Sequence, residues 1–254
     1  MLVDRKASVL VTGSAGRVGR AAVAALVKAG WHVRGFDLSP TPGTKDFIEG
    51  NLADFEALRR AVKGASTLIH LGATPDDDDF MTRLLPGNLV GLHHALEAAR
   101  EAGVQRVMLA STGQVNWWQQ IEGPLPIRPD DPPTPKLWYA VTKVAAEAAG
   151  KAFAKSFGMT VLAVRLGWCP RTREQMAEIA AGARFQDIYL SPSDAGRFFV
   201  RAVEADLPPG FFTLFVSSRP VRKAVFDSGP TETLLGWEPQ DQWPAGAEHG
   251  LNEA

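Results

Sequence analysis

A chain of 254 residues, of which 45% are hydrophobic and 22% are charged, has the composition of an ordinary globular protein with a sizeable core. The formal net charge of −1 gives no electrostatic basis for binding nucleic acid or an anionic membrane, and the single cysteine excludes an intrachain disulfide. Charged residues at positions 4–6 precede a short apolar run, which is typical neither of a signal peptide nor of a membrane span, so we expect a cytoplasmic protein.

The first two-thirds of the chain alternate short β-branched runs with segments rich in Ala and Leu. The runs predict strands, and the segments, most of which are followed by a glycine, predict helices. The predicted strands are Ser8–Thr12, Trp31–Phe36, Thr67–His70, Arg106–Ala110 and Thr160–Leu166. The predicted helices are Arg17–Ala29, Phe55–Lys63, Asn88–Ala102 and Trp138–Phe157. This alternation predicts an α/β protein with a doubly wound, Rossmann-like parallel sheet.

The strand–helix rhythm breaks after Gly167. Helical patterns at Arg173–Ala181 and Ser193–Ala205, an apolar strand at Phe211–Ser217 and a tail rich in Pro and Trp follow. We therefore expect residues 1–167 to form the dinucleotide-binding domain, and residues 168–254 to form a small C-terminal lobe that binds substrate, with a return of the chain to the main domain left open.

An acidic run at Asp76–Asp79 stands out in an otherwise mixed sequence. We expect it to cap the next helix or to be solvated. No His or Cys flanks it at ligand spacing, so we predict no metal site.

Directly after the first predicted strand comes TGSAGRVGR, in which Gly13, Gly16 and Gly19 have the spacing GxxGxxG. A strand, a tight glycine turn and a helix together let the backbone approach a pyrophosphate at the helix N-terminus. Asp37 stands at the end of the second strand, 18 residues after Gly19, where a carboxylate accepts hydrogen bonds from the adenosine ribose. The combination predicts a dinucleotide site; the alternative is an incidental turn followed by a loop Asp.

Asp37 also indicates which dinucleotide binds. Its charge would repel the 2′-phosphate of NADP, and Leu38 beside it offers no cation. Arg17, in the glycine turn, is the one nearby charge that would compensate. The sequence therefore predicts NAD.

Tyr139 and Lys143 are four residues apart in the predicted helix Trp138–Phe157, so they lie on one face of it. Removing a hydride from an alcohol requires a base for the hydroxyl proton, and a free phenol, with a pKa of about 10, is a poor one at neutral pH. A neighbouring ammonium and a positively charged nicotinamide would lower that pKa, and the same ammonium would bind the nicotinamide ribose. The alternative is a surface Tyr and Lys on an amphipathic helix.

The motifs TGSAGRVG, GNLAD (50–54), HLGA (70–73), ASTG (110–113) and YAVTK (139–143) stand in the order found in one known family. Over about residues 8–167 the chain resembles an extended short-chain dehydrogenase/reductase of the NAD-dependent epimerase/dehydratase type. The resemblance implies that Thr112 donates a hydrogen bond to the substrate oxygen, and that Asn51 contacts adenine. His70, at the end of a buried strand, is expected to be structural.

The cofactor contacts that we expect combine the glycine turn, the strand ends and the catalytic helix. They are Gly13, Gly16, Arg17, Val18, Gly19, Asp37, Leu38, Asn51, Leu52, Leu71, Gly72, Ala73, Ser111, Tyr139, Lys143 and Leu166. The expected catalytic residues are Thr112, Tyr139 and Lys143, and the expected substrate contacts are Thr74, Thr112, Gly113, Trp168 and Arg184.

The segments GNLVGLHHALEAAR (87–100), YLSPSD (189–194) and LLGWEPQD (234–241) carry a closer resemblance, to the uronate dehydrogenases within that family. It implies that Arg184, five residues before Tyr189, pairs with a substrate carboxylate, for which a planar guanidinium is well suited. The substrate half departs from that pattern: Gly113 and Gln114 replace Asn and His, and Trp168 replaces a Ser.

Several aromatic and apolar residues leave two interpretations open. Trp117, Trp118 and Trp168 would either line the substrate pocket or pack the lobe against the sheet. Cys169 is expected to be a buried small residue. Small side chains along the predicted helix 138–157 favour a homodimer or higher homo-oligomer through a helical face.

These observations favour an NAD-dependent oxidoreductase that oxidises a hydroxyl of a sugar acid or a related sugar, with Tyr139 as the base. An NAD-dependent sugar epimerase or dehydratase is the first alternative, although 87 residues after Gly167 are few for a domain that binds a nucleotide sugar. A non-enzymatic NAD-sensing regulator is the second, although such proteins commonly lose the Tyr or the Lys.

Overall fold

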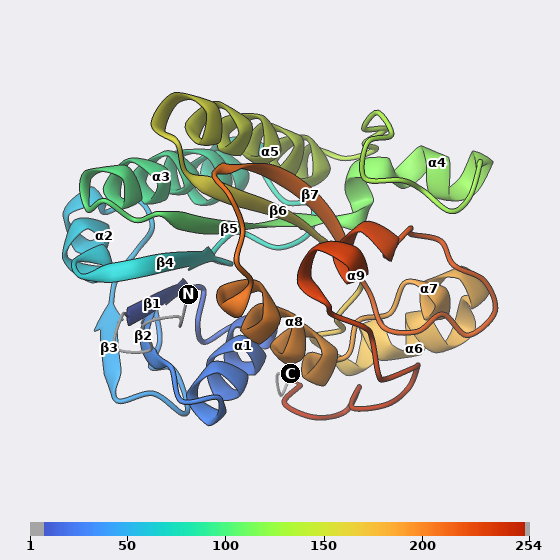
Figure 1. The fold of residues 1–254 in the computed structure, drawn as a ribbon. Helices are drawn as coiled ribbons and strands as arrows, with labels where there is room; N and C mark the ends of the chain where they lie inside the picture. Colours follow the sequence, from blue (N-terminus) through green and yellow to red (C-terminus); the bar gives the residue numbers. More distant parts are fainter. Residues whose placement is uncertain (1–7, 252–254) are drawn as a thin grey trace.

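A computed structural model describes residues 8–251, and the charged start at residues 4–6 lies outside them. The fold is built on a seven-stranded sheet in the order β3-β2-β1-β4-β5-β6-β7, in which every neighbouring pair is parallel (Figure 1). The strands are β1 (Ser8–Thr12), β2 (His32–Asp37), β3 (Asp46–Glu49), β4 (Ala65–His70), β5 (Arg106–Thr112), β6 (Thr160–Leu166) and β7 (Gly210–Val216). The predicted α/β class and doubly wound sheet are confirmed.

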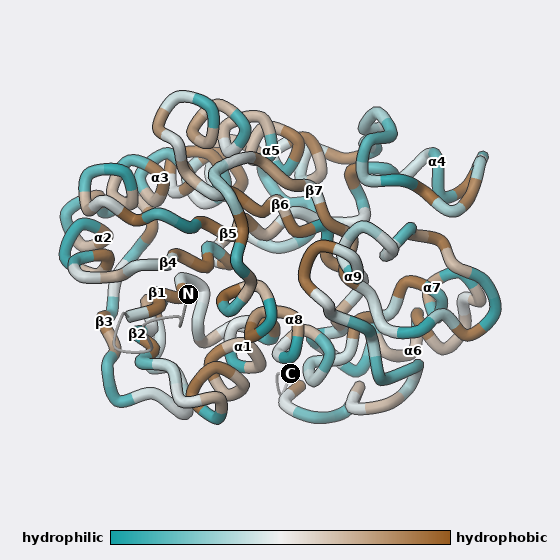
Figure 2. Tube along the Cα trace, in the orientation of Figure 1, coloured by the Kyte–Doolittle hydropathy of each residue, from teal (hydrophilic) through white to brown (hydrophobic). Residues whose placement is uncertain are grey.

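Helices cover both faces of the sheet, because strands rich in Val, Leu and Ile must be buried on both sides. Helices α1 (Arg17–Lys28) and α8 (Pro192–Glu204) cover one face, and α2 (Phe55–Val62), α3 (Gly91–Glu101) and α5 (Trp138–Phe157) cover the other (Figure 1). Apolar residues follow the central strands and hydrophilic residues gather in the outer turns (Figure 2). Within residues 8–251, no helix is long and apolar enough to cross a bilayer.

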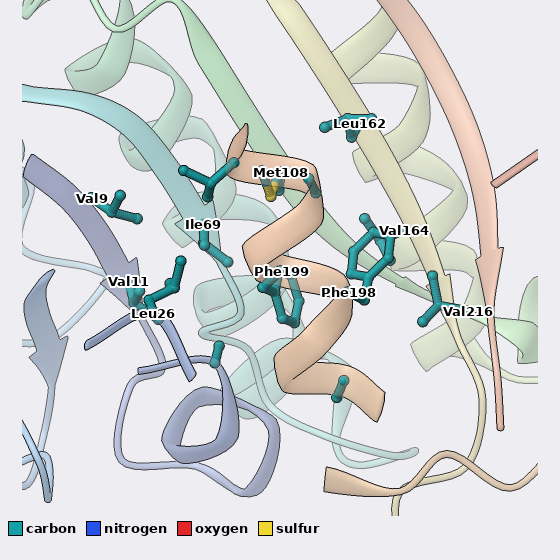
Figure 3. Packing of buried hydrophobic residues seen from close by; sticks show 14 of the residues in the cluster. Val9, Val11, Leu26, Ile69, Met108, Leu162, Val164, Phe198, Phe199 and Val216 are labelled. Carbon is teal, nitrogen blue, oxygen red and sulfur yellow. The ribbon is translucent and has the colours of Figure 1, made fainter. Parts of the chain in front are cut away.

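Strand β7 and helix α8 change the expected division of the chain. Although both follow Gly167, β7 pairs with β6 along its whole length and α8 packs on α1. Phe198 and Phe199 of α8 are fully buried in one cluster with Met108 and Val164 of the sheet (Figure 3). The chain thus leaves the main layers after β6 and returns to them at α8 and β7, which is the return that was left open.

The smaller part of the fold is built from two separate stretches of chain. The first contains α6 (Arg173–Ala181) and α7 (Ala183–Asp187), and the second contains α9 (Gly229–Leu235). Isolated bridges join Trp168 to Tyr189 and Ile127 to Phe226, so these stretches are fastened to the end of the sheet. Helices η2 (Gly113–Asn116) and α4 (Trp117–Glu122) follow β5 on the same side.

One helix differs from its predicted form. The pattern predicted a helix from Asn88, whereas a wide helical segment, η1 (Phe80–Val90), precedes α3 and contains Pro86. Proline has no N–H to donate and usually ends a helix, which is why the pattern starts only after it. The wide turn accommodates the proline, and the Gly91 N–H donates to the Pro86 carbonyl.

Candidate active site

A cleft with a volume of about 1120 Å³ runs along the carboxyl ends of the parallel strands. Its walls come from the turns after β1, β2, β4, β5 and β6, and from the start of the C-terminal part. The strand order reverses between β1 and β4, and this is the point of an open α/β sheet at which ligands bind.

Two glycines of the turn after β1 cannot be replaced without a clash. Gly13 has a φ of +67°, and a Cβ on it would lie 2.5 Å from the backbone nitrogen of Gly72. A Cβ on Gly19 would lie 2.1 Å from the carbonyl oxygen of Gly13. The turn therefore packs closely on α1, whose first N–H groups have no acceptor within the helix and suit a pyrophosphate.

Asp37 ends β2 at the wall of this cleft. Its Oδ2 accepts the Ala15 N–H at 2.9 Å, and its Oδ1 accepts the Leu38 N–H at 2.7 Å. The carboxylate is thus fixed beside the glycine turn, where the ribose of a dinucleotide would meet it. The glycine cradle and this acceptor together fit NAD.

Arg17 is the one nearby cation that was considered able to offset the repulsion between Asp37 and a 2′-phosphate. Its guanidinium is buried and donates from Nη2 to the Ala247 carbonyl at 2.7 Å and to the Gly246 carbonyl at 3.5 Å. Among residues 8–251, no ion pair joins Arg17 to Asp37. The C-terminal segment therefore holds the cation, and the negative charge of Asp37 stands uncompensated.

The remaining expected cofactor residues lie on the same cleft. Those of the glycine turn, the strand ends and the sheet centre that line it are Val18, Leu38, Asn51, Leu52, Leu71, Gly72, Ala73 and Leu166. Asn51 uses its side-chain oxygen to accept the Ala53 N–H at 2.9 Å, so it also shapes the turn that follows β3.

Tyr139 and Lys143 occupy one face of α5 and line the cleft opposite the end of β5. The Lys143 Nζ lies 5.6 Å from the centroid of the Tyr139 ring. Thr112, the last residue of β5, lies close enough to the phenol to lower its pKa. The structure therefore brings together the three residues that were expected to be catalytic.

Burial shifts the pKa values of both residues of the Tyr–Lys pair. Burial raises the pKa of Tyr139, and the carboxylate of Asp76 raises it further, whereas Arg171 and Thr112 lower it. Burial lowers the pKa of Lys143 to about 8. The lowering of the Tyr139 pKa was expected from Lys143 together with a positively charged nicotinamide, and in the protein alone the burial of the phenol outweighs the effect of its neighbours. A phenolate requires further positive charge in the cleft.

Ser111, the residue before Thr112, lines the cleft, and its hydroxyl also belongs to a buried network. Its hydroxyl donates to the Glu147 carboxylate at 2.6 Å. Arg165 holds the same carboxylate from Nε and Nη2, both at 2.9 Å, and its Nη1 donates to Asn116 Oδ1 at 3.0 Å. This buried network locks α5 against β5 and β6, and so fixes the distance between Tyr139 and Thr112.

His70 and Cys169 are structural, as expected. The His70 ring is buried and shares a hydrogen bond of 2.8 Å with the Thr12 hydroxyl. Burial, with the charge of Lys143, lowers the pKa of His70 to about 3, so the ring is neutral. Burial raises the pKa of Cys169 to about 11, which leaves an unreactive thiol.

At the substrate end, Thr74, Gly113 and Trp168 line the cleft. A Cβ on Gly113 would lie 2.4 Å from the Phe226 ring, so this glycine leaves room for an aromatic wall. Trp168 packs edge-on against Phe185, with 5.0 Å between the ring centroids. Trp117 also lines the cleft, whereas Trp118 does not and is 42% exposed.

Arg184 alone among the expected site residues does not line the cleft. Its guanidinium lies over Trp117 and Phe185, 5.1 Å and 5.0 Å from the ring centroids. The carboxylates that were considered as surface partners are engaged elsewhere, Asp187 by Arg222 and Asp76 by Arg171. Arg184 therefore packs on the aromatic side chains of Trp117 and Phe185 and does not line the cleft.

The acidic run, by contrast, reaches into the site. Asp79 caps η1 by accepting the Thr82 N–H at 2.8 Å, as expected. Asp77 accepts the Tyr139 N–H at 3.1 Å, and Asp76 forms an ion pair with Arg171 across the cleft.

Three residues at this end of the cleft were not predicted from the sequence: Asp76, Arg171 and Gln175. The one available signal was position, since Arg171 follows the carboxyl end of a parallel strand. Within the described part of the chain, no cluster of three or more acidic, His or Cys residues is arranged to hold a metal ion.

Fold and site together define a dinucleotide-binding α/β protein with a Tyr–Lys pair beside the cofactor cleft. The model of the NAD dependent epimerase/dehydratase family matches residues 9–168, which is more than half of the chain. The chain belongs to this family, and its cofactor is NAD.

Two curated relatives extend the match over most of the chain. L-arabinose 1-dehydrogenase (NAD(P)(+)) of Haloferax volcanii is 33% identical over 92% of this chain and 97% of its own length. Uronate dehydrogenase of Agrobacterium fabrum is 29% identical over 94% of this chain and 87% of its own length.

Solved structures show the same similarity. Uronate dehydrogenase from Agrobacterium tumefaciens superposes with a TM-score of 0.75 at 27% identity, covering 96% of this chain and 88% of that one. Glucuronic acid dehydrogenase from Chromohalobacter salexigens superposes with a TM-score of 0.79 at 26% identity, covering 100% of this chain and 91% of that one. A point mutant of the Agrobacterium tumefaciens enzyme was solved in complex with NAD.

Proposed function

We propose that this protein is an NAD-dependent dehydrogenase that oxidises a hydroxyl group of a sugar acid or a related sugar. The observation that carries the proposal is the meeting of Thr112, Tyr139 and Lys143 beside the dinucleotide cradle. The names of its relatives, which include an arabinose dehydrogenase and uronate dehydrogenases, support the substrate class.

The reaction removes a proton from the substrate hydroxyl and a hydride from the carbon that bears it. Bound NAD supplies the ring carbon that accepts the hydride and adds positive charge to the cleft. The Tyr139 oxygen, as phenolate, takes the proton. Thr112 Oγ1 donates a hydrogen bond to the substrate oxygen and holds it within reach of the phenol. The Lys143 ammonium favours the phenolate over the neutral phenol through its charge.

The direct test is a panel of aldoses and sugar acids, supplied one at a time with NAD, in which NADH formation is followed by absorbance. Net accumulation of NADH with at least one substrate is the expected result. Conversion of a sugar without net NADH would indicate an epimerase or dehydratase, in which the cofactor is reduced and reoxidised in one cycle. Binding of NAD without conversion of any sugar would favour a sensing role.

Cofactor selectivity should follow from the uncompensated carboxylate of Asp37. We expect NAD to bind at least about tenfold more tightly than NADP, a difference of about 1.4 kcal/mol. Asp37→Asn should narrow the gap, because it removes the charge but keeps an oxygen for the Ala15 N–H. Calorimetric titration with both cofactors measures the ratio. Equal or tighter binding of NADP to the unaltered protein would contradict the assignment.

The expected homo-oligomer also remains a proposal, and the exposed face of α5 supports it. Trp138 at the start of this helix is 59% exposed and packs against Phe80 of η1, and Val141, one turn later on the same side, is 38% exposed. Pairing of two such faces would cover these side chains. Light scattering on the purified protein gives the assembly state, and Val141→Glu should favour the monomer.

We also propose, as the sequence led us to expect, that the protein is cytoplasmic.

A further inference from the structure

Two hydrogen-bond donors at the substrate end of the cleft converge on one carboxylate oxygen. Arg171 Nη2 forms an ion pair with Asp76 Oδ2, and Gln175 Nε2 donates to the same oxygen at 3.2 Å. Gln175 Oε1 in turn accepts the backbone N–H of Arg171 at 2.8 Å, which fixes the two side chains relative to each other. Arg171 and Gln175 therefore form a preassembled carboxylate site, and Asp76 occupies it.

This site faces the reacting groups. Arg171, Gln175 and Asp76 all line the cleft together with Tyr139. The charges of Arg171 and Asp76 both act on the Tyr139 phenol, so both groups lie within electrostatic range of it. Asp77, the next residue, accepts the Tyr139 N–H and holds this loop at the start of α5. Arg184 does not line the cleft and is not among the charges that shift the pKa of Tyr139.

Asp76 is held in this position only weakly. Its side chain is 47% exposed and that of Arg171 is 29% exposed, and ion pairs in such surroundings contribute little. Asp76 also has a φ of +60°, which no other non-glycine residue among 8–251 shares in sign. Asp is among the non-glycine residues that adopt this left-handed backbone most readily, and it suits the turn that presents the Asp76 carboxylate to Arg171.

We propose that Arg171, together with Gln175, binds the carboxylate of a sugar-acid substrate, and that Asp76 occupies this site until the substrate carboxylate takes its place. The inference rests on the proposed function, since it names the part of that substrate which the cleft recognises. It assigns to Arg171 the role that the sequence resemblance implied for Arg184. Asp76 is then a built-in competitor that weakens the binding of acids relative to neutral sugars.

Binding can be measured apart from turnover in a Tyr139→Phe protein saturated with NAD, by calorimetric titration with galacturonate and with galactose. Asp76→Asn removes the competing charge and should strengthen galacturonate binding about fivefold or more. Arg171→Gln should weaken it about tenfold or more. Galactose has no carboxylate, so both changes should leave its affinity within about twofold.

Two matched variants serve as controls. Asp78→Asn removes a neighbouring charge of the acidic run that pairs with Arg83 and does not line the cleft. Arg184→Gln removes the alternative cation. Neither should change the ratio of the galacturonate and galactose affinities.

The proposal is overturned if Arg184→Gln, and not Arg171→Gln, selectively weakens galacturonate, or if Asp76→Asn leaves the affinity ratio unchanged. Failure of both sugars to bind any variant would also overturn it.

Turnover of the protein with Tyr139 intact separates the proposed carboxylate site from the proposed dehydrogenase activity. NADH formation without an effect of Asp76→Asn would leave the dehydrogenase standing and remove the carboxylate site. The converse, selective binding without NADH formation, would keep the site and remove the dehydrogenase.

Discussion

Tyr139→Phe should lower turnover by about 10²- to 10⁴-fold while NAD affinity changes little. The substitution removes only the phenolic oxygen, so the proton of the substrate hydroxyl loses its acceptor. The ring remains on α5 beside Lys143, and the glycine cradle that fits the pyrophosphate lies on another element. Single-turnover NADH formation and calorimetric titration of NAD measure the two effects separately.

Companion variants distinguish the roles of the three catalytic residues. Lys143→Met should impair both turnover and NAD binding, because the ammonium is expected to serve both. Thr112→Ala should cost less than Tyr139→Phe, and Thr112→Ser should retain much of the activity, since a hydroxyl is kept. Near-normal turnover of Tyr139→Phe would refute the mechanism.

Arg165→Met should lower the free energy of unfolding by about 3–5 kcal/mol, because it leaves the Glu147 carboxylate buried with only the Ser111 hydroxyl as a partner. The side chains of Arg165 and Glu147 are 4% and 10% exposed, so water does not replace the lost donor. The Arg165 Nη1 bond to Asn116 is lost as well. For a chain of this size, the melting temperature should fall by about 2–4 °C per kcal/mol.

Arg128→Met is the matched control. Arg128 pairs with Asp130, but their side chains are 66% and 73% exposed, and such pairs contribute about 0–1 kcal/mol. Urea denaturation of both variants gives the comparison. If the two unfold at the same urea concentration, the buried network does not stabilise the fold as its geometry indicates.

Local patterns were enough to predict most of the sheet and its helices. Strands β1 and β6 and helices α5 and α6 have the predicted bounds, because the strands are continuous apolar runs and each helix is followed by a glycine, such as Gly158 after α5. The glycine turn and the Tyr–Lys pair could also be predicted, since both depend on residues that are close in the sequence. Strand β3 (Asp46–Glu49) was missed because four half-exposed residues at a sheet edge carry little periodicity.

The substrate end could not be predicted in the same way. Asp76 and Arg171 are 95 residues apart in the sequence. They are in contact only because the turns after β4 and β6 meet at the carboxyl ends of the parallel strands. Arg184 shows the converse, since a resemblance in local sequence did not reveal that its guanidinium packs over Trp117 and does not line the cleft. The strand β7 was predicted and its return to the main domain was left open, because an apolar strand pattern does not say which neighbour it pairs with.

The two separate stretches that form the smaller part of the fold have a consequence for how such a protein diversifies. Described residues that line the substrate end beyond β6 fall between 167 and 188 or at Phe226, on either side of α8 and β7. Insertions or exchanges in these two connections would alter the pocket without disturbing the sheet that holds the cofactor turn. New substrate preferences can therefore evolve, or be engineered, by replacing two loops while the intervening helix and strand serve as a constant anchor.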